Sequence, residues 1–268
     1  MGRSQNRKME FQRFTVKDEK CAMKIGTDGV LLGAWASTQS PDKALDIVDV
    51  GSGSGVVALM LAQRFTESKV TAVELEPLAV EQSQENFERS PFTSRMKCVE
   101  ASFQDWATEG DNQSSFDLVV SNPPFFNGKP KSPFHARNLA RHDDYLNISD
   151  LFEGAEKVLR AEGVFCLVWP VEREADLMAA AKMRKFHVIR KCIIRPTPQH
   201  NPVRFLVEFK KETSGNQNVP SIILTNIVLE TGEGEGRHFT SQHNELMKAF
   251  FLQTECLWGC KSPSNDAS

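Results

Sequence analysis

The 268-residue sequence lacks an overall positive charge, a long apolar run and a paired cysteine motif. Its formal net charge of −3 provides no global field that would attract a nucleic acid, so any such contact would depend on local basic segments. No stretch approaches the roughly 18 apolar residues of a membrane span, and the first residues contain no apolar signal region. We therefore expect a cytoplasmic protein that does not enter a membrane.

The six cysteines are scattered along the chain, and none belongs to a Cys-x-x-Cys pair. Cys256 and Cys260 are separated by three residues and have no second pair, which makes them weak candidates for metal ligands. Several of the other cysteines lie in apolar segments, where free thiols are commonly buried. This usage is typical of a reducing compartment, and we expect no bound metal.

Apolar runs with strand character alternate with helical segments. Strands are expected at residues 44–50, 69–73, 96–100, 116–121, 164–169, 187–194, 203–209 and 222–229, and helices at 30–36, 56–63, 78–89, 148–160, 172–183 and 245–252. The alternation over the first half predicts a parallel sheet with right-handed crossovers. Ligands of such sheets bind outside the carboxyl ends of the strands, so residues that follow each strand are the candidates for a site.

A glycine-rich turn follows the first of these strands. Gly51, Gly53 and Gly55 precede the helix that begins at Val56, which lets the backbone approach a ligand at a helix N-terminus. The third glycine comes one position too early for the G-x-G-x-x-G pattern of dinucleotide folds. A pyrophosphate cradle is therefore disfavoured.

Polar residues also follow the second and third strands. Glu74 ends the second strand, and its carboxylate can accept hydrogen bonds from both hydroxyls of a ribose. Glu76 is an alternative that we interpret as a surface charge. Residues 101–105 follow the third strand, where the adenine ring of a bound ligand would meet the chain. Together these positions predict a nucleoside-binding edge.

The fourth strand ends in Ser-Asn-Pro-Pro-Phe-Phe, residues 121–126. Two prolines cannot continue a central strand, so the chain leaves the sheet and displays Asn122 there. The Asn122 side chain and the carbonyl of Pro123 offer two acceptors for a planar amino group, and Phe125 offers a face on which a flat ring can stack. Such bonds would let a ring-bound amino nitrogen attack a methyl donor. An Asn turn cap in a proline loop is the alternative interpretation.

The remaining segments offer helix caps and basic residues. Thr27 or Asp28 can cap the first helix, although Asp28 fits a role in the site equally well, and Ser241 can cap the last helix. Residues 128–145 are rich in Lys, Arg and His, as a functional loop beside a site would be, or as a solvated loop would be. Residues 182–211 contain nine Lys or Arg against the single acid Glu208. They fit either a nucleic acid backbone or an antiparallel strand pair that completes the sheet.

Three motifs together resemble one enzyme superfamily. Asp-Val-Gly-Ser-Gly-Ser-Gly (49–55), Glu74 and Asn-Pro-Pro-Phe (122–125) resemble the class I S-adenosylmethionine-dependent methyltransferases that act on planar amino nitrogens. The segment Asp-Glu-Lys-Cys-Ala-Met-Lys-Ile-Gly-Thr-Asp-Gly-Val-Leu-Leu-Gly-Ala-Trp (18–35) closely resembles the bacterial tRNA1(Val) (adenine-37-N6)-methyltransferases, and the resemblance extends over residues 11–252. It implies an α/β Rossmann-like fold with a mostly parallel seven-stranded sheet, an antiparallel last strand and helices on both faces. It also implies S-adenosyl-L-methionine as cofactor and tRNA as partner.

The resemblance assigns a role to individual residues. Those implied to bind the cofactor are Lys24, Thr27, Asp28, Asp49, Gly51, Gly53, Gly55, Glu74, Leu75, Ser102, Phe103 and Asn122. Those implied to hold the target adenine are Asn122, Pro123, Pro124 and Phe125, and those implied to contact RNA are Arg137, Arg141, Arg195 and Arg204. One position departs from the pattern, because related enzymes often carry Asp where this chain has Ser102. Either Asp105, or Ser102 with a backbone carbonyl, would have to bind the cofactor adenine.

The Asn-Pro-Pro-aromatic signature alone leaves other functions open. A methyltransferase acting on DNA adenine, rRNA or a protein glutamine amide would share it, and a non-enzymatic cofactor-binding module is a third possibility. We expect a monomer with three parts: an N-terminal extension on the cofactor side (1–36), a methyltransferase domain (37–252) and a tail with a disordered end (253–268).

Overall fold

The computed structural model describes residues 8–37, 39, 41–124, 147–212, 221–232 and 238–251. Its strands are β1 (Lys8–Glu10), β2 (Thr15–Lys17), β3 (Asp46–Val50), β4 (Lys69–Glu74), β5 (Met96–Glu100), β6 (Phe116–Ser121), β7 (Leu159–Pro170), β8 (Phe186–Arg195), β9 (Arg204–Lys211) and β10 (Ile223–Val228). Its helices are α1 (Thr27–Trp35), α2 (Val56–Arg64), α3 (Pro77–Glu88), α4 (Phe103–Trp106), α6 (Ile148–Val158), α7 (Glu174–Met183) and α8 (Ser241–Met247). Short 3₁₀ turns lie at Thr93–Arg95, Gly110–Asn112 and Val171–Arg173.

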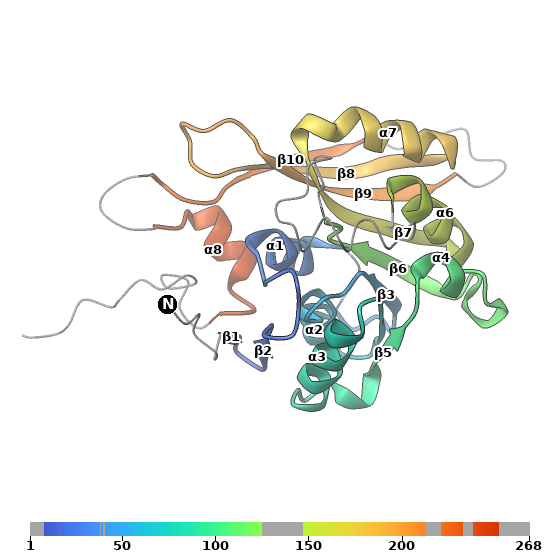
Figure 1. Ribbon diagram of the computed structural model, residues 1–268. Coiled ribbons are helices and arrows are strands. Elements are labelled where there is room, and N and C mark those ends of the chain that lie inside the picture. Colours follow the sequence, from blue (N-terminus) through green and yellow to red (C-terminus); the bar gives the residue numbers. More distant parts are fainter. Residues whose placement is uncertain are drawn as a thin grey trace, which may run out of the picture.

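The described strands form a small β1–β2 hairpin and a large sheet in the order β10-β8-β9-β7-β6-β3-β4-β5 (Figure 1). Strands β3 to β7 pair in parallel, β9 runs antiparallel to both β7 and β8, and β10 pairs in parallel with β8. The predicted fold class is confirmed. The described part of the sheet nevertheless has eight strands rather than seven, and its antiparallel strand is β9 rather than the last one. A short connection makes β8 and β9 a hairpin, and β10 then adds to the free edge of β8.

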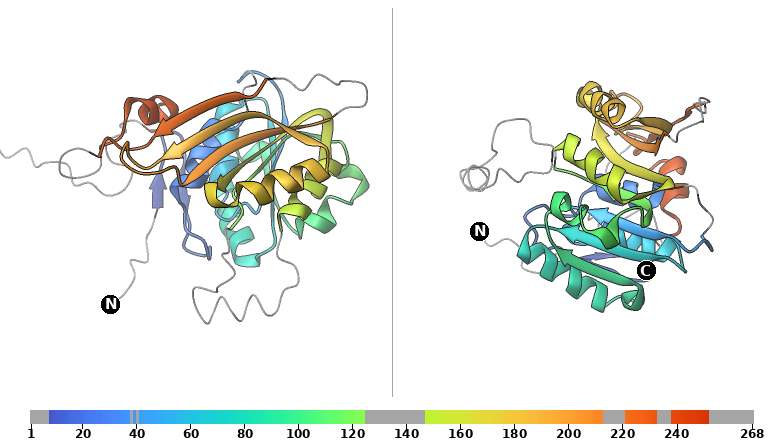
Figure 2. Two further views of the ribbon diagram at one scale, coloured as in Figure 1. Left: turned by 90° about the horizontal axis from the view of Figure 1, so that it is seen from above. Right: turned by 90° about the vertical axis from the view of Figure 1, so that its right-hand side faces the viewer.

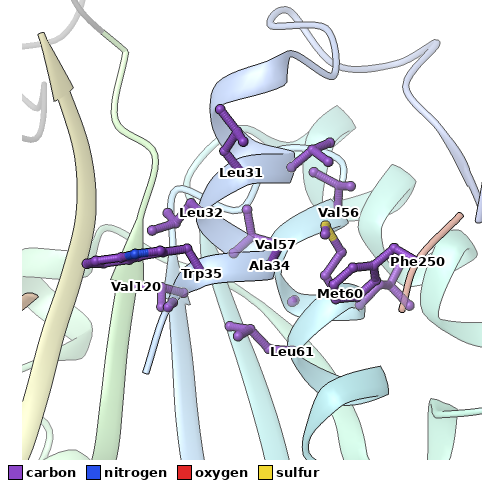
Figure 3. Packing of buried hydrophobic residues seen from close by; sticks show 14 of the residues in the cluster. Leu31, Leu32, Ala34, Trp35, Val56, Val57, Met60, Leu61, Val120 and Phe250 are labelled. Carbon is purple, nitrogen blue, oxygen red and sulfur yellow. The ribbon is translucent and has the colours of Figure 1, made fainter. Parts of the chain in front are cut away.

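Two apolar clusters cover the two faces of the sheet. Successive residues of a strand point to opposite faces, so Ile47 belongs to the cluster with α1, α2 and α8, whereas Val48 belongs to the cluster with α4, α6 and α7. Figure 2 shows α7 and α8 on opposite sides of β8, β9 and β10. Figure 3 shows the first cluster, in which side chains of α1 and α2 pack together with Val120 of β6 and with Phe250.

The N-terminal strands pack against the last described residues. The Phe11 ring lies 4.8 Å from the Phe251 ring, measured between centroids, and 4.4 Å from the Phe14 ring. The backbone N–H of Gln12 donates to the carbonyl of Phe250 at 2.8 Å. The N-terminal segment therefore shares the main core.

Two predicted helix caps are wrong. The N-cap of α1 is Gly26, which has no side chain to cap with, so Thr27 and Asp28 lie inside the first turn. The last helix begins at Ser241 and ends at Met247, and its cap is Thr240, whose Oγ1 accepts a hydrogen bond from the His243 N–H. Both errors are one or two residues long, because Gly also caps helices and because Thr240 and Ser241 are neighbouring candidates.

The described cysteines are free thiols, as expected: Cys21, Cys166 and Cys192 are buried and Cys98 is half-buried. Within the described ranges, no three His, Cys, Asp or Glu side chains lie together as a metal site requires. No helix in this part of the chain is long and apolar enough to cross a membrane.

Candidate active site

The ends of three parallel strands bring Gly51, Glu74 and Asn122 to one edge of the sheet. Val50 of β3 pairs with Val73 of β4 on one side and with Ser121 of β6 on the other. The residues that follow these positions, Gly51, Glu74 and Asn122, therefore lie side by side. The backbone confirms this alignment, because the Gly51 N–H donates to the Val73 carbonyl at 2.8 Å.

The three positions of the turn require glycine for different structural reasons. All have positive φ, at 67° for Gly51, 56° for Gly53 and 77° for Gly55, which disfavours any residue with a Cβ. A Cβ at Gly51 or Gly53 would meet no atom within 4 Å, so the space in front of these two residues is open. A Cβ at Gly55 would lie 2.5 Å from the Phe87 ring. Gly55 therefore serves helix packing, whereas Gly51 and Gly53 leave room for a ligand.

The Glu74 carboxylate is held in place by the backbone. One oxygen accepts from the Gly53 N–H at 2.9 Å, and the other accepts from the N–H groups of Leu75 and Glu76 at 2.9 and 3.0 Å. Glu74 is half-buried, and its carboxylate has lone pairs left for further donors. Leu75, 44% exposed, lies beside it as an apolar surface. Glu76 caps α3 instead, because its carboxylate accepts from the Ala79 N–H at 2.9 Å, which supports its interpretation as a bystander.

Asp49 supports the turn from below. It is 1% exposed, and its carboxylate accepts from the Ala58 N–H in the first turn of α2 at 3.1 Å. Burial raises the pKa of Asp49 to about 7, against the Ala58 hydrogen bond, which lowers it, and with a smaller contribution from the Glu74 charge. Asp49 thus supports the glycine turn by holding the start of α2 in place.

Sequence reasoning missed a set of buried polar residues on α3. Asn86 is 1% exposed and joins two segments: its amide donates to the carbonyls of Ser54 and Lys17, and its carbonyl accepts from the Lys17 N–H. The Ser83 hydroxyl donates to the Gly53 carbonyl at 2.7 Å. The sequence signal that could have revealed them is the spacing of Ser83 and Asn86, which places two polar side chains on one face of the helix. They fix the glycine turn and tie it to the N-terminal segment.

Lys24 lies in the loop before α1. Its Nζ donates to the backbone carbonyls of Asp18, Glu19 and Cys21 at 2.6, 3.2 and 2.9 Å. An ammonium group has three N–H donors, and these three bonds use them to stabilise the loop. Its contact with a cofactor stays a prediction.

Asn122 is half-buried and lies against the first turn of α1. A Cβ built on Gly29 would be 3.3 Å from Nδ2 of Asn122, so the amide lies beside the space that a side chain at residue 29 would occupy. The preceding Ser121 is anchored by its hydroxyl, which donates to the Val50 carbonyl at 2.9 Å. Pro123 is buried and Pro124 exposed, whereas the predicted stacking residue Phe125 lies outside the described residues.

At the end of β5, Ser102 and Asp105 interact with each other. The Ser102 hydroxyl caps α4 by accepting from the Asp105 N–H at 3.1 Å, and it donates to the Asp105 carboxylate at 2.7 Å. Phe103 is 4% exposed and packs against Gly154 and Trp106, so its ring belongs to the core. Ser102 and Asp105 form one polar unit at this strand end.

The basic segment 182–211 is largely neutralised within the protein. Six of its nine basic residues form ion pairs with acids: Arg184, Arg190, Lys191, Arg204, Lys210 and Lys211. These contacts favour the interpretation of the segment as strands that complete the sheet. Arg195 ends β8 at the carboxyl edge without an ion pair to the described acids. Arg137 and Arg141 lie outside the described residues.

Comparison with known proteins then decides the family. Residues 29–192 match the model of the methyltransferase small domain. A protein of Parabacteroides distasonis named tRNA1(Val) (adenine(37)-N6)-methyltransferase is 37% identical over 244 residues, which cover 91% of this chain and 97% of the relative. A protein of the same name from Christiangramia forsetii is 34% identical over 249 residues, covering 92% and 99%.

This chain belongs to the tRNA1(Val) (adenine(37)-N6)-methyltransferase family. The assignment predicted from the motifs is therefore confirmed. A solved structure from Agrobacterium tumefaciens, titled as a predicted O-methyltransferase, matches the fold with a TM-score of 0.64 at 21% identity, over 83% of this chain and 96% of that one. The fold of the tRNA1(Val) methyltransferase family thus also occurs in a protein titled for a different acceptor atom. This likeness therefore shows the fold alone, and the acceptor atom has to be argued from the side chains at the site.

Proposed function

We propose that this enzyme transfers a methyl group from S-adenosyl-L-methionine to N6 of adenosine 37 in tRNA1(Val), and that Asn122 and the Pro123 carbonyl hold the target amino group. The observation that carries the proposal is the alignment of three strand ends. It sets the open glycine turn, the Glu74 carboxylate and Asn122 next to one another. A donor and an acceptor of a methyl group would therefore meet at this edge.

The residues present fit the cofactor. The space in front of Gly51 and Gly53 is open, and the Glu74 carboxylate is fixed beside it with free lone pairs for ribose hydroxyls. Leu75 offers an apolar contact, and the Ser102–Asp105 unit is our candidate for binding the adenine amino group. When bound, S-adenosylmethionine supplies a methyl group already activated on a positively charged sulfonium.

The contribution of the protein is positioning. Two acceptors, the Asn122 side-chain oxygen and the Pro123 carbonyl, would each take one N–H of the target amino group. Both bonds favour a more tetrahedral nitrogen with an available lone pair, and Ser121 and Gly29 restrict where Asn122 can lie. The proton can leave the nitrogen after the methyl group has arrived.

Other features of the enzyme follow as proposals from this function. Arg195, at the carboxyl edge, is our candidate for an RNA phosphate contact, and Arg137 and Arg141 are further candidates on sequence grounds. We propose a monomer that works in the cytoplasm, where tRNA is found. We also propose that the chain divides at residues 36 and 252 into an N-terminal extension, the methyltransferase domain and a tail. The described part of the extension packs into the main core.

The test is methyl transfer from labelled S-adenosylmethionine to four substrates: unmodified tRNA1(Val), the same tRNA with adenosine 37 replaced, a DNA duplex and a release-factor protein. Label on the first substrate alone, recovered as N6-methyladenosine, is the expected result. Label on the DNA or protein instead would overturn the substrate assignment.

The role of Asn122 is tested in the same assay. Asn122→Ala is expected to lower the rate of transfer about 10²-fold or more, because it removes a preorganised hydrogen-bond partner. Asn226→Ala, at an exposed position on β10, is the matched control and should have the wild-type rate. Near-normal turnover of Asn122→Ala would remove the assigned role.

A further inference from the structure

The first turn of α1 lies beside the Asn122 amide and limits how far the amide can move in that direction. Gly29 is buried, and a Cβ at this position would stand 3.3 Å from the Asn122 Nδ2, closer than an ordinary van der Waals contact. The other neighbours of that Cβ, in Val57 and Val56, would be at 3.6 and 3.8 Å, which are ordinary contacts. A methyl group at residue 29 would therefore press on Asn122 while fitting its remaining surroundings.

The N-terminal end of α1 is fixed by an ion pair to the far part of the sheet. The Arg204 Nε donates to the Asp28 carboxylate at 3.2 Å, and both side chains are about one-third exposed. Arg204 can reach this edge because β9 is antiparallel and begins where the other strands end. The residue next to Asp28 in the helix is Gly29.

The C-terminal end of α1 is fixed independently. Arg64 donates to the carbonyls of Gly33, Ala36 and Ser37 at 3.0, 2.7 and 3.1 Å. Arg190 donates to the Trp35 carbonyl at 2.9 Å. Figure 3 shows the helix between these ends lying over β6, with Leu32 and Trp35 near Val120. Loss of the Asp28 contact would therefore loosen the first turn, while Val30 stays packed in the core and the rest of the helix stays in place.

We propose that Gly29 and the Asp28–Arg204 ion pair are positioning residues for methyl transfer, which act by setting the location of the Asn122 amide. Because Gly29 has no side chain, the Asn122 amide can lie closer to α1 than a larger residue at position 29 would allow. The ion pair holds the turn that carries Gly29. This inference rests on the proposed role of Asn122, and it gives Asp28 and Arg204 a joint function in place of separate contacts with cofactor and RNA.

The first experiment compares two added methyl groups on the same helix start. Gly29→Ala is expected to lower kcat about 10-fold or more, since a misplacement of a few tenths of an ångström to 1 Å at reacting groups is costly. The KM for each substrate should stay within about threefold, and the Tm should be unchanged or higher because Ala is the better helix former. Gly26→Ala is the control: its Cβ would find only the Lys24 carbonyl, at 4.0 Å, and kcat should be that of the wild type.

The second experiment separates positioning from RNA contact. Arg204→Gln and Asp28→Asn should each lower kcat, the double variant should be no slower than the slower single variant, and Arg204→Lys should restore part of the rate. A rise in the KM for tRNA with unchanged kcat in Arg204→Gln would instead make Arg204 an RNA contact and overturn its positioning role.

Asn122→Ala, measured alongside, distinguishes the two ways to fail. Full activity of Asn122→Ala would mean that the proposed function of Asn122 is wrong. An inactive Asn122→Ala together with equal kcat for Gly29→Ala and Gly26→Ala would refute this inference and leave the proposed function standing.

Discussion

Replacement of the buried Asp49 by Asn should change how the stability of the protein depends on pH. Asn keeps the side-chain oxygen that accepts from the Ala58 N–H, and it does not titrate. In the native protein, burial raises the pKa of Asp49 from 3.8 to about 7. The unfolded chain therefore releases this proton at a much lower pH than the native protein does.

The size and the sign of the effect follow from this difference. The stability contributed by the protonated native carboxyl is fully present below the unfolded pKa of 3.8 and is lost as pH rises to about 7. A difference of about three pH units, at about 1.4 kcal/mol per unit, amounts to about 4 kcal/mol. The free energy of unfolding of Asp49→Asn minus that of the wild type should therefore increase by about 4 kcal/mol between about pH 4 and about pH 8.

Urea unfolding of both proteins without cofactor, at several pH values in this range, measures the difference directly. Every other titrating group is common to the two proteins, so the subtraction isolates Asp49. Asp111→Asn removes a charge at an exposed position and should show no such trend. A free-energy difference that stays constant or decreases with pH would refute the reasoning.

Two further changes test the glycine turn and the core. Gly55→Ala should lower the free energy of unfolding in urea by about 2 kcal/mol or more, since it adds a clash with Phe87 to an unfavourable φ. Gly53→Ala should lower it by about 1 kcal/mol and should mainly weaken cofactor binding, which calorimetry measures. Equal losses of stability in the two variants would contradict this contrast. Arg190→Gln should cost about 3 kcal/mol, because it leaves the nearly buried Glu208 without its ion pair at 2.6 Å, and a loss below about 1 kcal/mol in thermal unfolding would show that this charge is otherwise compensated.

The central sheet could be predicted from local pattern. The strands Met96–Glu100 and Phe116–Ser121 have the predicted bounds, because each is a short strand-forming run between turn residues. The residues at the strand ends, Gly51, Glu74 and Asn122, come together as predicted because parallel strands end at a common edge. The strand bounds depend on neighbours in the sequence, and the meeting of the strand ends follows from the general rule for parallel sheets.

The remaining features depend on partners that are distant in the sequence. The sequence predicts a cap or a site role for Asp28 but does not show its ion pair with Arg204, 176 residues away. Arg190 was counted toward a basic patch, yet Glu208 of the neighbouring strand neutralises it. Asn86 carried no motif at all, and its role exists only because the glycine turn and the N-terminal segment meet at α3. A sequence pattern gives residue type and spacing, but it does not show which distant partner a charge or an amide will meet.

The contact between the first and the last described segments has a consequence for biosynthesis. Gln12 donates to the carbonyl of Phe251, 239 residues later, and the Phe11 ring lies against that of Phe251. During translation the N-terminal strands leave the ribosome early, but these partners are added only after nearly all of the sheet has been made. We therefore expect the nascent chain to keep Phe11 without this ring partner until then. A ribosome stalled before residue 251 should carry a protein in which the segment around Phe11 is cut by protease faster than in the finished chain, even though the glycine turn and Asn122 are already present.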